Sequence, residues 1–161
     1  MRRATKVLPP GSWNKTETVG AACLSYDDRY RRRTTLRDRD GGEFLLDLEK
    51  TRLLVHGEGL GLEGGGVIEV IAADEAVADI HTHDAAQTAR IAWHIGNRHT
   101  PLQVLKGGGL RIRFDAILVA MVEGLCAHVH AVTAPFAPES GAYAPQSGHH
   151  HSHHGHHDHK H

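Results

Sequence analysis

The sequence is short of cysteine, of long apolar runs and of net charge, and each shortage excludes a class of protein. Its two cysteines, Cys23 and Cys126, stand far apart and form no Cys-x-x-Cys pattern, which argues against a disulfide scaffold or a structural zinc site. No segment is long and apolar enough to span a bilayer, and residues 1–13 lack the apolar run of a signal peptide. The net charge of -1 does not indicate a nucleic-acid partner. We therefore expect a cytoplasmic protein that binds neither nucleic acid nor membrane.

Histidine, by contrast, is abundant: the chain has 16, and nine of them lie in the last 13 residues. These nine are His149, His150, His151, His153, His154, His156, His157, His159 and His161. Serine, glycine, aspartate and lysine interrupt the run irregularly, unlike a six-histidine purification tag, which favours a native metal-binding tail. Residues 135–161 are expected to be a linker and tail that are disordered without metal, because they cannot bury apolar surface.

Residues 1–73 have short apolar alternation broken by turn residues, which is typical of a small all-β domain. The Asp-Arg-Asp-Gly-Gly sequence at 38–42 predicts a hairpin turn between strands at Thr34–Leu36 and Glu43–Leu48. Two further strands are expected at Thr51–His56 and Val67–Ala72. No run with helical spacing exceeds one turn.

Two motifs in this half are misleading. Residues 59–64 match Gly-x-Gly-x-x-Gly, but a glycine-rich turn and another strand follow, and dinucleotide binding needs a helix there. The basic run Arg29–Arg33 is interpreted as a solvated strand face balanced by nearby aspartates. A surface for an acidic protein partner is the alternative.

After residue 75 glycine becomes scarce, alanine common, and the apolar spacing changes to that of helices. We expect a second domain over residues 76–134 with the order βαββαβ, the split arrangement of a ferredoxin-like fold. The first strand is predicted at Val77–His81, and Asp84 then caps a helix from Ala85 to about Gly96. Two strands follow, at Leu102–Lys106 and Leu110–Phe114. Asp115 caps the second helix, whose buried residues are Leu118, Met121, Val122 and Leu125, and the last strand is predicted at His128–Ala134. The predicted fold class is α+β.

His99 stands just past a predicted helix stop, Gly96-Asn97, and before Pro101. Counting back at helical spacing from His99 reaches Ile95, Ala92, Thr88 and Ala85, so we expect His99 to continue the core-facing stripe. His94 is in line with Arg90 and Gln87, which predicts a solvated polar stripe.

Residues 93–103, Trp-His-Ile-Gly-Asn-Arg-His-Thr-Pro-Leu-Gln, closely resemble the signature of urease accessory protein E, the nickel metallochaperone family of urease maturation. Residues 134–143, Ala-Pro-Phe-Ala-Pro-Glu-Ser-Gly-Ala-Tyr, followed by the histidine-rich tail, resemble it too. The resemblance covers roughly residues 75–161 well. It implies a peptide-binding N-terminal β domain, a ferredoxin-like C-terminal domain, and a head-to-head homodimer with His99 of each chain at the interface. It also implies that nickel passes toward the urease apoprotein with GTPase and scaffold partners. Many relatives carry a further histidine cluster where this chain has Arg113-Phe114-Asp115-Ala116, so that relay site is lost or moved.

Neutral imidazole suits nickel, and also copper, zinc and cobalt. One His99 cannot hold such an ion, but a two-fold dimer presents two copies, and tail histidines from either chain complete the shell. His81, His128 and His130, assisted by His83, form a hypothetical auxiliary site on an exposed sheet face; the alternative is simply polar residues on a wet face.

Three functions remain open on the residues alone: a nickel metallochaperone, a passive metal buffer acting through the tail, and a metalloenzyme. The last is disfavoured because no His-x-x-x-His or His-Glu-x-x-His motif is present and no carboxylate stands beside His99. No catalytic residues are therefore expected. Nickel itself is inferred from the family resemblance, since imidazole sites bind copper more tightly.

Overall fold

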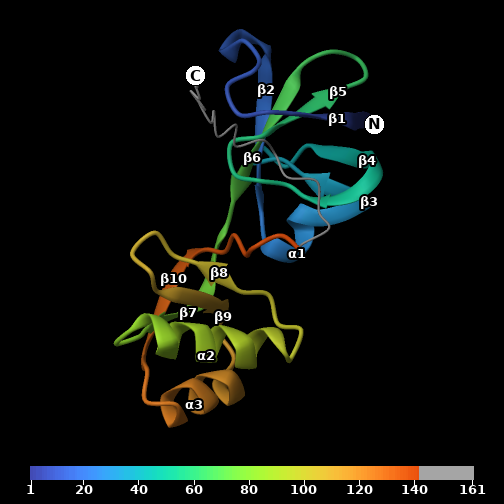
Figure 1. The fold of residues 1–161 in the computed structure, drawn as a ribbon. Coiled ribbons are helices and arrows are strands. Elements are labelled where there is room, and N and C mark those ends of the chain that lie inside the picture. The colour runs from blue at the N-terminus through green and yellow to red at the C-terminus, as the bar shows by residue number, and fades with distance from the viewer. Residues whose placement is uncertain (142–161) are drawn as a thin grey trace, which may run out of the picture.

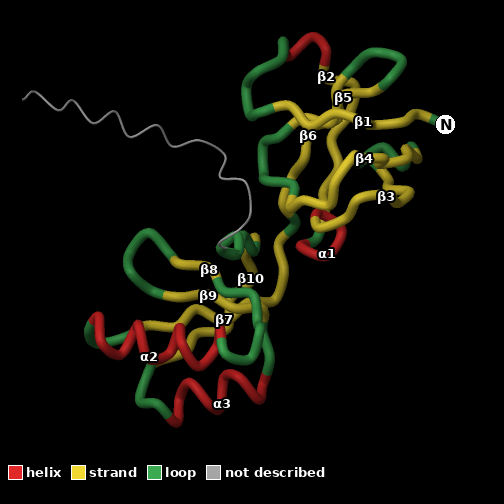
Figure 2. The backbone as a smooth tube through the Cα atoms, turned by 45° about the vertical axis from the view of Figure 1, so that its right-hand side comes forward, coloured by secondary structure: helices red, strands yellow, loops and turns green. Residues whose placement is uncertain are grey.

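The computed structural model describes residues 1–141, and in them the chain is an α+β protein with two sheets (Figure 1). The tail histidines lie outside these residues. One lobe contains β1 (Arg2–Leu8), η1 (Lys15–Glu17), β2 (Thr18–Leu24), α1 (Tyr26–Arg29), β3 (Tyr30–Arg37), β4 (Glu43–Leu53), β5 (Gly59–Leu62) and β6 (Val67–Ala72). The other contains β7 (Asp74–His81), α2 (Ala85–Gly96), β8 (Gln103–Val104), β9 (Leu110–Arg113), α3 (Ala116–Gly124) and β10 (His128–Pro135). In Figure 2 the chain crosses between the lobes where β6 leads into β7. No helix of the described residues is long and apolar enough to cross a membrane.

The N-terminal lobe is built on a six-stranded sheet with the order β2-β6-β5-β1-β4-β3. Its core gathers buried aliphatic residues and Phe44 from most of these strands. The predicted hairpin is confirmed, but both strands are longer than expected, because β3 and β4 stay paired from Arg37↔Glu43 to Tyr30↔Leu53. The separate strand predicted at Thr51–His56 is wrong for the same reason: its first three residues complete β4 and the rest lie outside any strand.

The C-terminal lobe has a four-stranded antiparallel sheet with the order β10-β7-β9-β8, the order that a βαββαβ chain of this type gives. Helices α2 and α3 both cover one face of it (Figures 1 and 2). Ile91 and Ile95 of α2 and Val122 of α3 are buried there against the sheet. Asp84 and Asp115 cap the two helices as predicted. The strand expected at Leu102–Lys106 is shorter, with two residues in β8.

Polar and aromatic contacts join the two lobes. The Tyr26 backbone N–H donates to Glu75 at 2.8 Å, and the Arg113 guanidinium forms a 2.9 Å ion pair with Asp27. The same guanidinium lies 5.1 Å from the centre of the Tyr26 ring. After β10 the chain returns to the junction, where buried Phe136 meets Tyr26 edge-on, with ring centres 5.4 Å apart. We call residues 136–139 the return segment.

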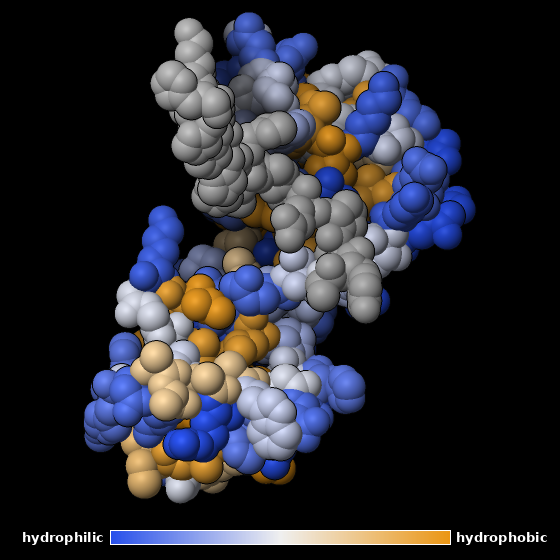
Figure 3. Space-filling model, viewed as in Figure 1, coloured by the Kyte–Doolittle hydropathy of each residue, from blue (hydrophilic) through white to orange (hydrophobic). Residues whose placement is uncertain are grey.

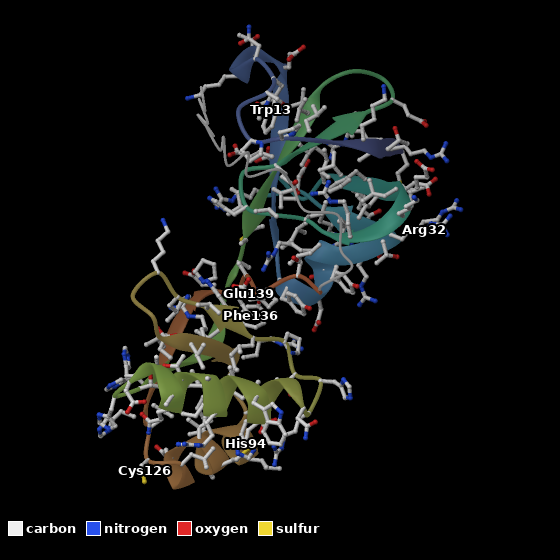
Figure 4. The ribbon with its side chains drawn as sticks, viewed as in Figure 1. Trp13, Arg32, His94, Cys126, Phe136 and Glu139 are labelled. Atoms are coloured by element: carbon white, nitrogen blue, oxygen red, sulfur yellow. The ribbon has the colours of Figure 1, made fainter. Side chains whose placement is uncertain are left out.

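Hydrogen bonds fasten the return segment on both sides. Buried Arg29 donates to the carbonyls of Leu54 and Phe136, and burial lowers the pKa of its guanidinium. The side-chain carbonyl of Gln103 accepts from the Ala137 N–H at 3.0 Å. Phe136 and Glu139 accordingly lie close together beside the junction in Figure 4.

Candidate metal centre

Helix α2 ends in a left-handed turn built around His99. The His99 N–H donates to the Gly96 carbonyl at 2.9 Å, and the Thr100 N–H reaches the Ile95 carbonyl at 3.4 Å. This bonding pattern is a Schellman motif, in which the residue at the position of His99 adopts positive φ. His99 has φ 55°. Glycine is the usual residue there because it has no Cβ to clash, so this position holds an imidazole at a conformational cost.

The expectation that His99 continues the core-facing stripe of α2 is wrong within one chain. His99 is exposed, because the left-handed turn ends the helical periodicity before its side chain reaches the core. Gln87, expected on the polar stripe, is instead buried. Its side chain accepts from the His83 N–H at 2.7 Å and donates to the Leu125 carbonyl at 3.1 Å. His94 is half-buried, with its ring edge-on to Trp93 at 4.9 Å.

The C-terminal lobe exposes large apolar side chains as well as the His99 imidazole. Trp93, six residues earlier on α2, is 62% exposed, and Ile117 at the start of α3 is 82% exposed. In Figure 3 the C-terminal lobe presents a mosaic of apolar and hydrophilic side chains to the viewer. Within residues 1–141 no three histidine, cysteine, aspartate or glutamate side chains are grouped to hold a metal ion. Among residues 1–141 of one chain, His99 is therefore not grouped with two further side chains of these kinds.

The return segment approaches the loop that contains His99. The Glu139 N–H donates to the Leu102 carbonyl at 2.7 Å, and the Glu139 carboxylate accepts from the Val104 N–H at 3.3 Å. Leu102 follows His99 by three residues. Sequence reasoning did not assign these roles to Glu139 and Gln103, although both lie inside the two segments that carry the family resemblance.

The four histidines of the hypothetical auxiliary site lie close together, and they do so as two pairs. His128 is the register partner of His81, and His130 is the partner of Asp79. The ring centres of His81 and His130 are 5.2 Å apart, and those of His83 and His128 are 5.4 Å apart. The four histidines thus form two close pairs, His81 with His130 and His83 with His128, and metal binding by His81, His128 and His130 stays a prediction.

Asp79, on the same face as these histidines, is held by Arg111. The guanidinium donates to both carboxylate oxygens, at 2.6 and 2.8 Å. This pair holds the pKa of Asp79 below its usual range, mainly through the hydrogen bonds from Arg111. The carboxylate is thus already engaged by a cation.

The residues at the start of α3, where the sequence departs from the family pattern, have structural roles or no ligand atom. Arg113 forms the ion pair with Asp27, exposed Phe114 has no ligand atom, and the Asp115 carboxylate caps α3. Cys126, two residues before His128, is exposed and ends α3 with φ 64° (Figure 4).

The basic run is only partly the solvated face that was expected. Arg29 is 1% exposed and bonds to backbone carbonyls, whereas Arg31, Arg32 and Arg33 are exposed on β3. Two of its expected aspartate neighbours pair with other arginines: Asp38 with Arg2 at 2.6 Å and Asp27 with Arg113 at 2.9 Å. Gly59–Gly64 falls on β5 and the turn into β6, so no helix N-terminus follows it.

Comparison with known proteins decides the family. The model of the UreE urease accessory protein N-terminal domain matches residues 4–73, and that of the C-terminal domain matches residues 75–161. The chain belongs to the UreE urease accessory protein family. A urease accessory protein UreE from Beijerinckia indica is 44% identical over 142 residues, which cover 88% of this chain and 81% of the relative. Relatives of the same description from a Bradyrhizobium species and from Rhodobacter capsulatus are 47% and 43% identical, each over 88% of this chain and over 67% and 86% of the relative.

For this UreE family member, sequence reasoning identified the helix that ends just before His99 and the two strands that carry His81, His128 and His130. It missed the exposure of His99 and the burial of Gln87. The signal for the exposure of His99 was Pro101, two residues later, because the chain has to leave the helix before a proline. Both matched segments, residues 93–103 and 134–141, meet at the hydrogen bonds between Glu139 and the start of β8.

Proposed function

We propose that the chain is a nickel-binding metallochaperone that delivers Ni(II) for assembly of the urease metallocentre. The observation that carries this proposal is the exposed His99, held in a left-handed conformation where glycine would be relaxed. A residue retained in a strained backbone conformation on the surface is poorly explained by the needs of the fold. It is well explained by a requirement for an accessible imidazole at that point.

The proposal requires a homodimer with two-fold symmetry. A single imidazole does not retain a transition metal, but an isologous interface brings His99 of one protomer opposite His99 of its partner. The exposed Trp93, on the last turn of α2, supports an interface at this end of the helix, because burial of a large apolar side chain removes its unfavourable contact with water. Histidines of the tail would complete the ligand shell, so the site stays open and exchangeable.

The nickel ion is cargo in this proposal, received and passed on by exchange of imidazole ligands, and no catalytic step is assigned to the chain. Its partners are the urease apoprotein and the accessory GTPase and scaffold proteins, in the cytoplasm. Copper, zinc and cobalt also suit imidazole, so nickel selectivity depends on cellular supply and on the partners.

The alternative is a passive metal buffer that binds ions through the tail alone. The two proposals differ in what His99 does. In the full chain, His99→Ala should abolish the tight binding of one nickel per dimer and leave weaker tail binding, measured by calorimetry together with particle mass. His94→Ala, which removes a half-buried histidine from α2 just before His99, is the matched control and should bind like the wild type.

A second variant, with the nine tail histidines replaced by serine, completes the test. The metallochaperone proposal expects it to keep one nickel per dimer and some urease activation. A buffer would lose essentially all nickel in this variant and none of its capacity in His99→Ala. Unchanged tight binding in His99→Ala would sink the interface assignment.

A further inference from the structure

We propose that the open face of the C-terminal sheet carries a second metal-binding surface, a ladder of four histidines that forms two bis-imidazole sites. The ladder consists of His81, His83, His128 and His130, all exposed. Each site would take one borderline divalent cation, such as Ni2+ or Zn2+, with water in the remaining positions. This inference goes beyond the proposed function of His99 and does not depend on it.

The ladder follows from strand register. In an antiparallel pair, directly opposite residues lie on the same face, and residues two apart on one strand share that face. His128 opposes His81 and His130 opposes Asp79. The rings then lean diagonally, so that His81 meets His130 and His83 meets His128.

The ring separations suit coordination of one ion by each pair. An imidazole nitrogen about 2.1 Å from a metal places its ring centre roughly 3.2 Å from that ion, so two tetrahedral ligands have ring centres roughly 5 Å apart. The measured separations are 5.2 Å for His81 and His130 and 5.4 Å for His83 and His128. Small rotations of the exposed side chains would therefore bring one nitrogen from each ring of a pair onto the same ion.

The backbone under the ladder is firmly held. β7 and β10 keep an unbroken register from His128↔His81 to Pro135↔Asp74. His83 lies two residues past β7, but its N–H is fixed by buried Gln87. Ligands placed on rigid elements lose little conformational entropy when they bind an ion, which favours binding by only two imidazoles.

Asp79 does not join the coordination shell, because both of its oxygens accept hydrogen bonds from Arg111. The pairs therefore have purely imidazole protein ligands, which selects borderline cations over magnesium and calcium, whose preferred ligands are oxygens.

The ladder lies on the opposite face of the sheet from α2 and α3. Ala78 and Ile80 alternate with Asp79 and His81 along β7, and the two apolar residues pack into the core with the helices. His99 ends α2 on the helical side of the lobe. An ion on the ladder is thus bound separately from an ion at His99.

The test uses the full chain labelled with 15N and titrated with NiCl2, which broadens the amide signals of residues near bound paramagnetic nickel. We expect broadening in the second half of β7 and the first half of β10, in addition to that at His99. The double variant His81→Ala/His130→Ala should lose broadening around Asp79 and His130 and keep it around His83. His83→Ala/His128→Ala should show the reverse.

His94→Ala removes one histidine from α2 and serves as the control that leaves the ladder signals unchanged. Dispersed amide spectra without metal establish that each variant is folded. The inference is overturned if β7 and β10 broaden no more than exposed residues of β3, or if the double variants broaden as the wild type does. The titration of His99→Ala separates the two proposals, since loss of its interface site should leave broadening of the ladder intact.

Discussion

Two helix ends in the C-terminal lobe put a residue other than glycine where the backbone is left-handed. His99 ends α2 with φ 55° and Cys126 ends α3 with φ 64°. In both cases the N–H of the left-handed residue donates to the carbonyl three residues earlier, at 2.9 Å. A left-handed conformation costs free energy for a residue with a Cβ, so both positions carry backbone strain that glycine would relieve.

Replacing His99 by glycine should therefore stabilise the metal-free protein while removing the tight binding of one nickel per dimer. Relief of the left-handed strain is worth about 1 kcal/mol, measured by urea denaturation in the presence of a chelator. Cys126→Gly is the matched control, expected to gain similar stability and keep its nickel. If His99→Gly were less stable than His99→Ala, the strain at this position would have been misread.

Gln87 is a buried polar residue whose side chain bonds to two backbone groups. Gln87→Leu leaves the His83 N–H and the Leu125 carbonyl without their partner, and an unpaired buried group costs about 1–3 kcal/mol. We expect a net loss in that range, read from urea denaturation. Arg90→Leu on the exposed side of the same helix should change stability by no more than about 0.5 kcal/mol. Equal effects of the two substitutions would contradict the hydrogen-bonding role.

At the scale of elements, sequence reasoning worked where the signal is local. Asp84 and Asp115 fix the starts of α2 and α3 because a side-chain oxygen accepts from the first turn of the same helix. β1, β2 and β5 were not predicted. β2 and β5 contain glycine and small residues, and all three segments are strands because they pair with strands distant in the sequence. The histidine pairs were foreseeable as neighbours, since antiparallel register is set by fold order. The helix stop before His99 was predicted, but the left-handed conformation of His99 was not, because a residue other than glycine gives no local signal for positive φ.

The return segment is an element without regular structure whose position depends on Arg29. Arg29→Ala removes the donors to Leu54 and Phe136 and leaves a cavity at a side chain that is 1% exposed. We expect destabilisation of about 2–4 kcal/mol, seen as a lower midpoint in urea. Arg31→Ala, at an exposed position on β3, is the control and should lie within about 0.5 kcal/mol of the wild type. A small effect at Arg29 would mean that the segment is held chiefly by Gln103 and Glu139.

At the scale of the whole molecule, the ion pairs of the N-terminal lobe predict sensitivity to acid. Hydrogen bonds from Arg2 and Arg3 hold the pKa values of Asp38 and Asp47, respectively, below their usual range. A carboxyl with a lowered folded pKa contributes its full stability above its unfolded pKa of about 3.9, and loses it as the pH falls through the folded value. The thermal midpoint should therefore drop as the pH is lowered below about 4.

Asp38→Asn isolates one contributor to this acid response. The variant should be less stable than the wild type at pH 7, and the difference should shrink as the pH falls below about 4, because the wild-type carboxyl then becomes neutral as well. Thermal unfolding at a series of pH values measures both effects. Asp40→Asn, at an exposed position in the same turn, should follow the wild-type curve. A difference for Asp38→Asn that stayed constant down to pH 2.5 would exclude titration of this carboxyl as the cause.

The return segment also acts as a tether for everything that follows it in the chain. Its bond from Glu139 to Leu102 anchors the chain within three residues of His99. His149 follows Glu139 by ten residues, so its imidazole stays within roughly 35 Å of that anchor whatever path the chain takes. One ligand confined to such a volume has an effective concentration on the order of 10 mM, and each further tail histidine within reach raises it. In the proposed dimer, recruitment of a tail histidine to an ion at His99 would therefore be intramolecular, and this step would not weaken on dilution for as long as the two protomers stay together.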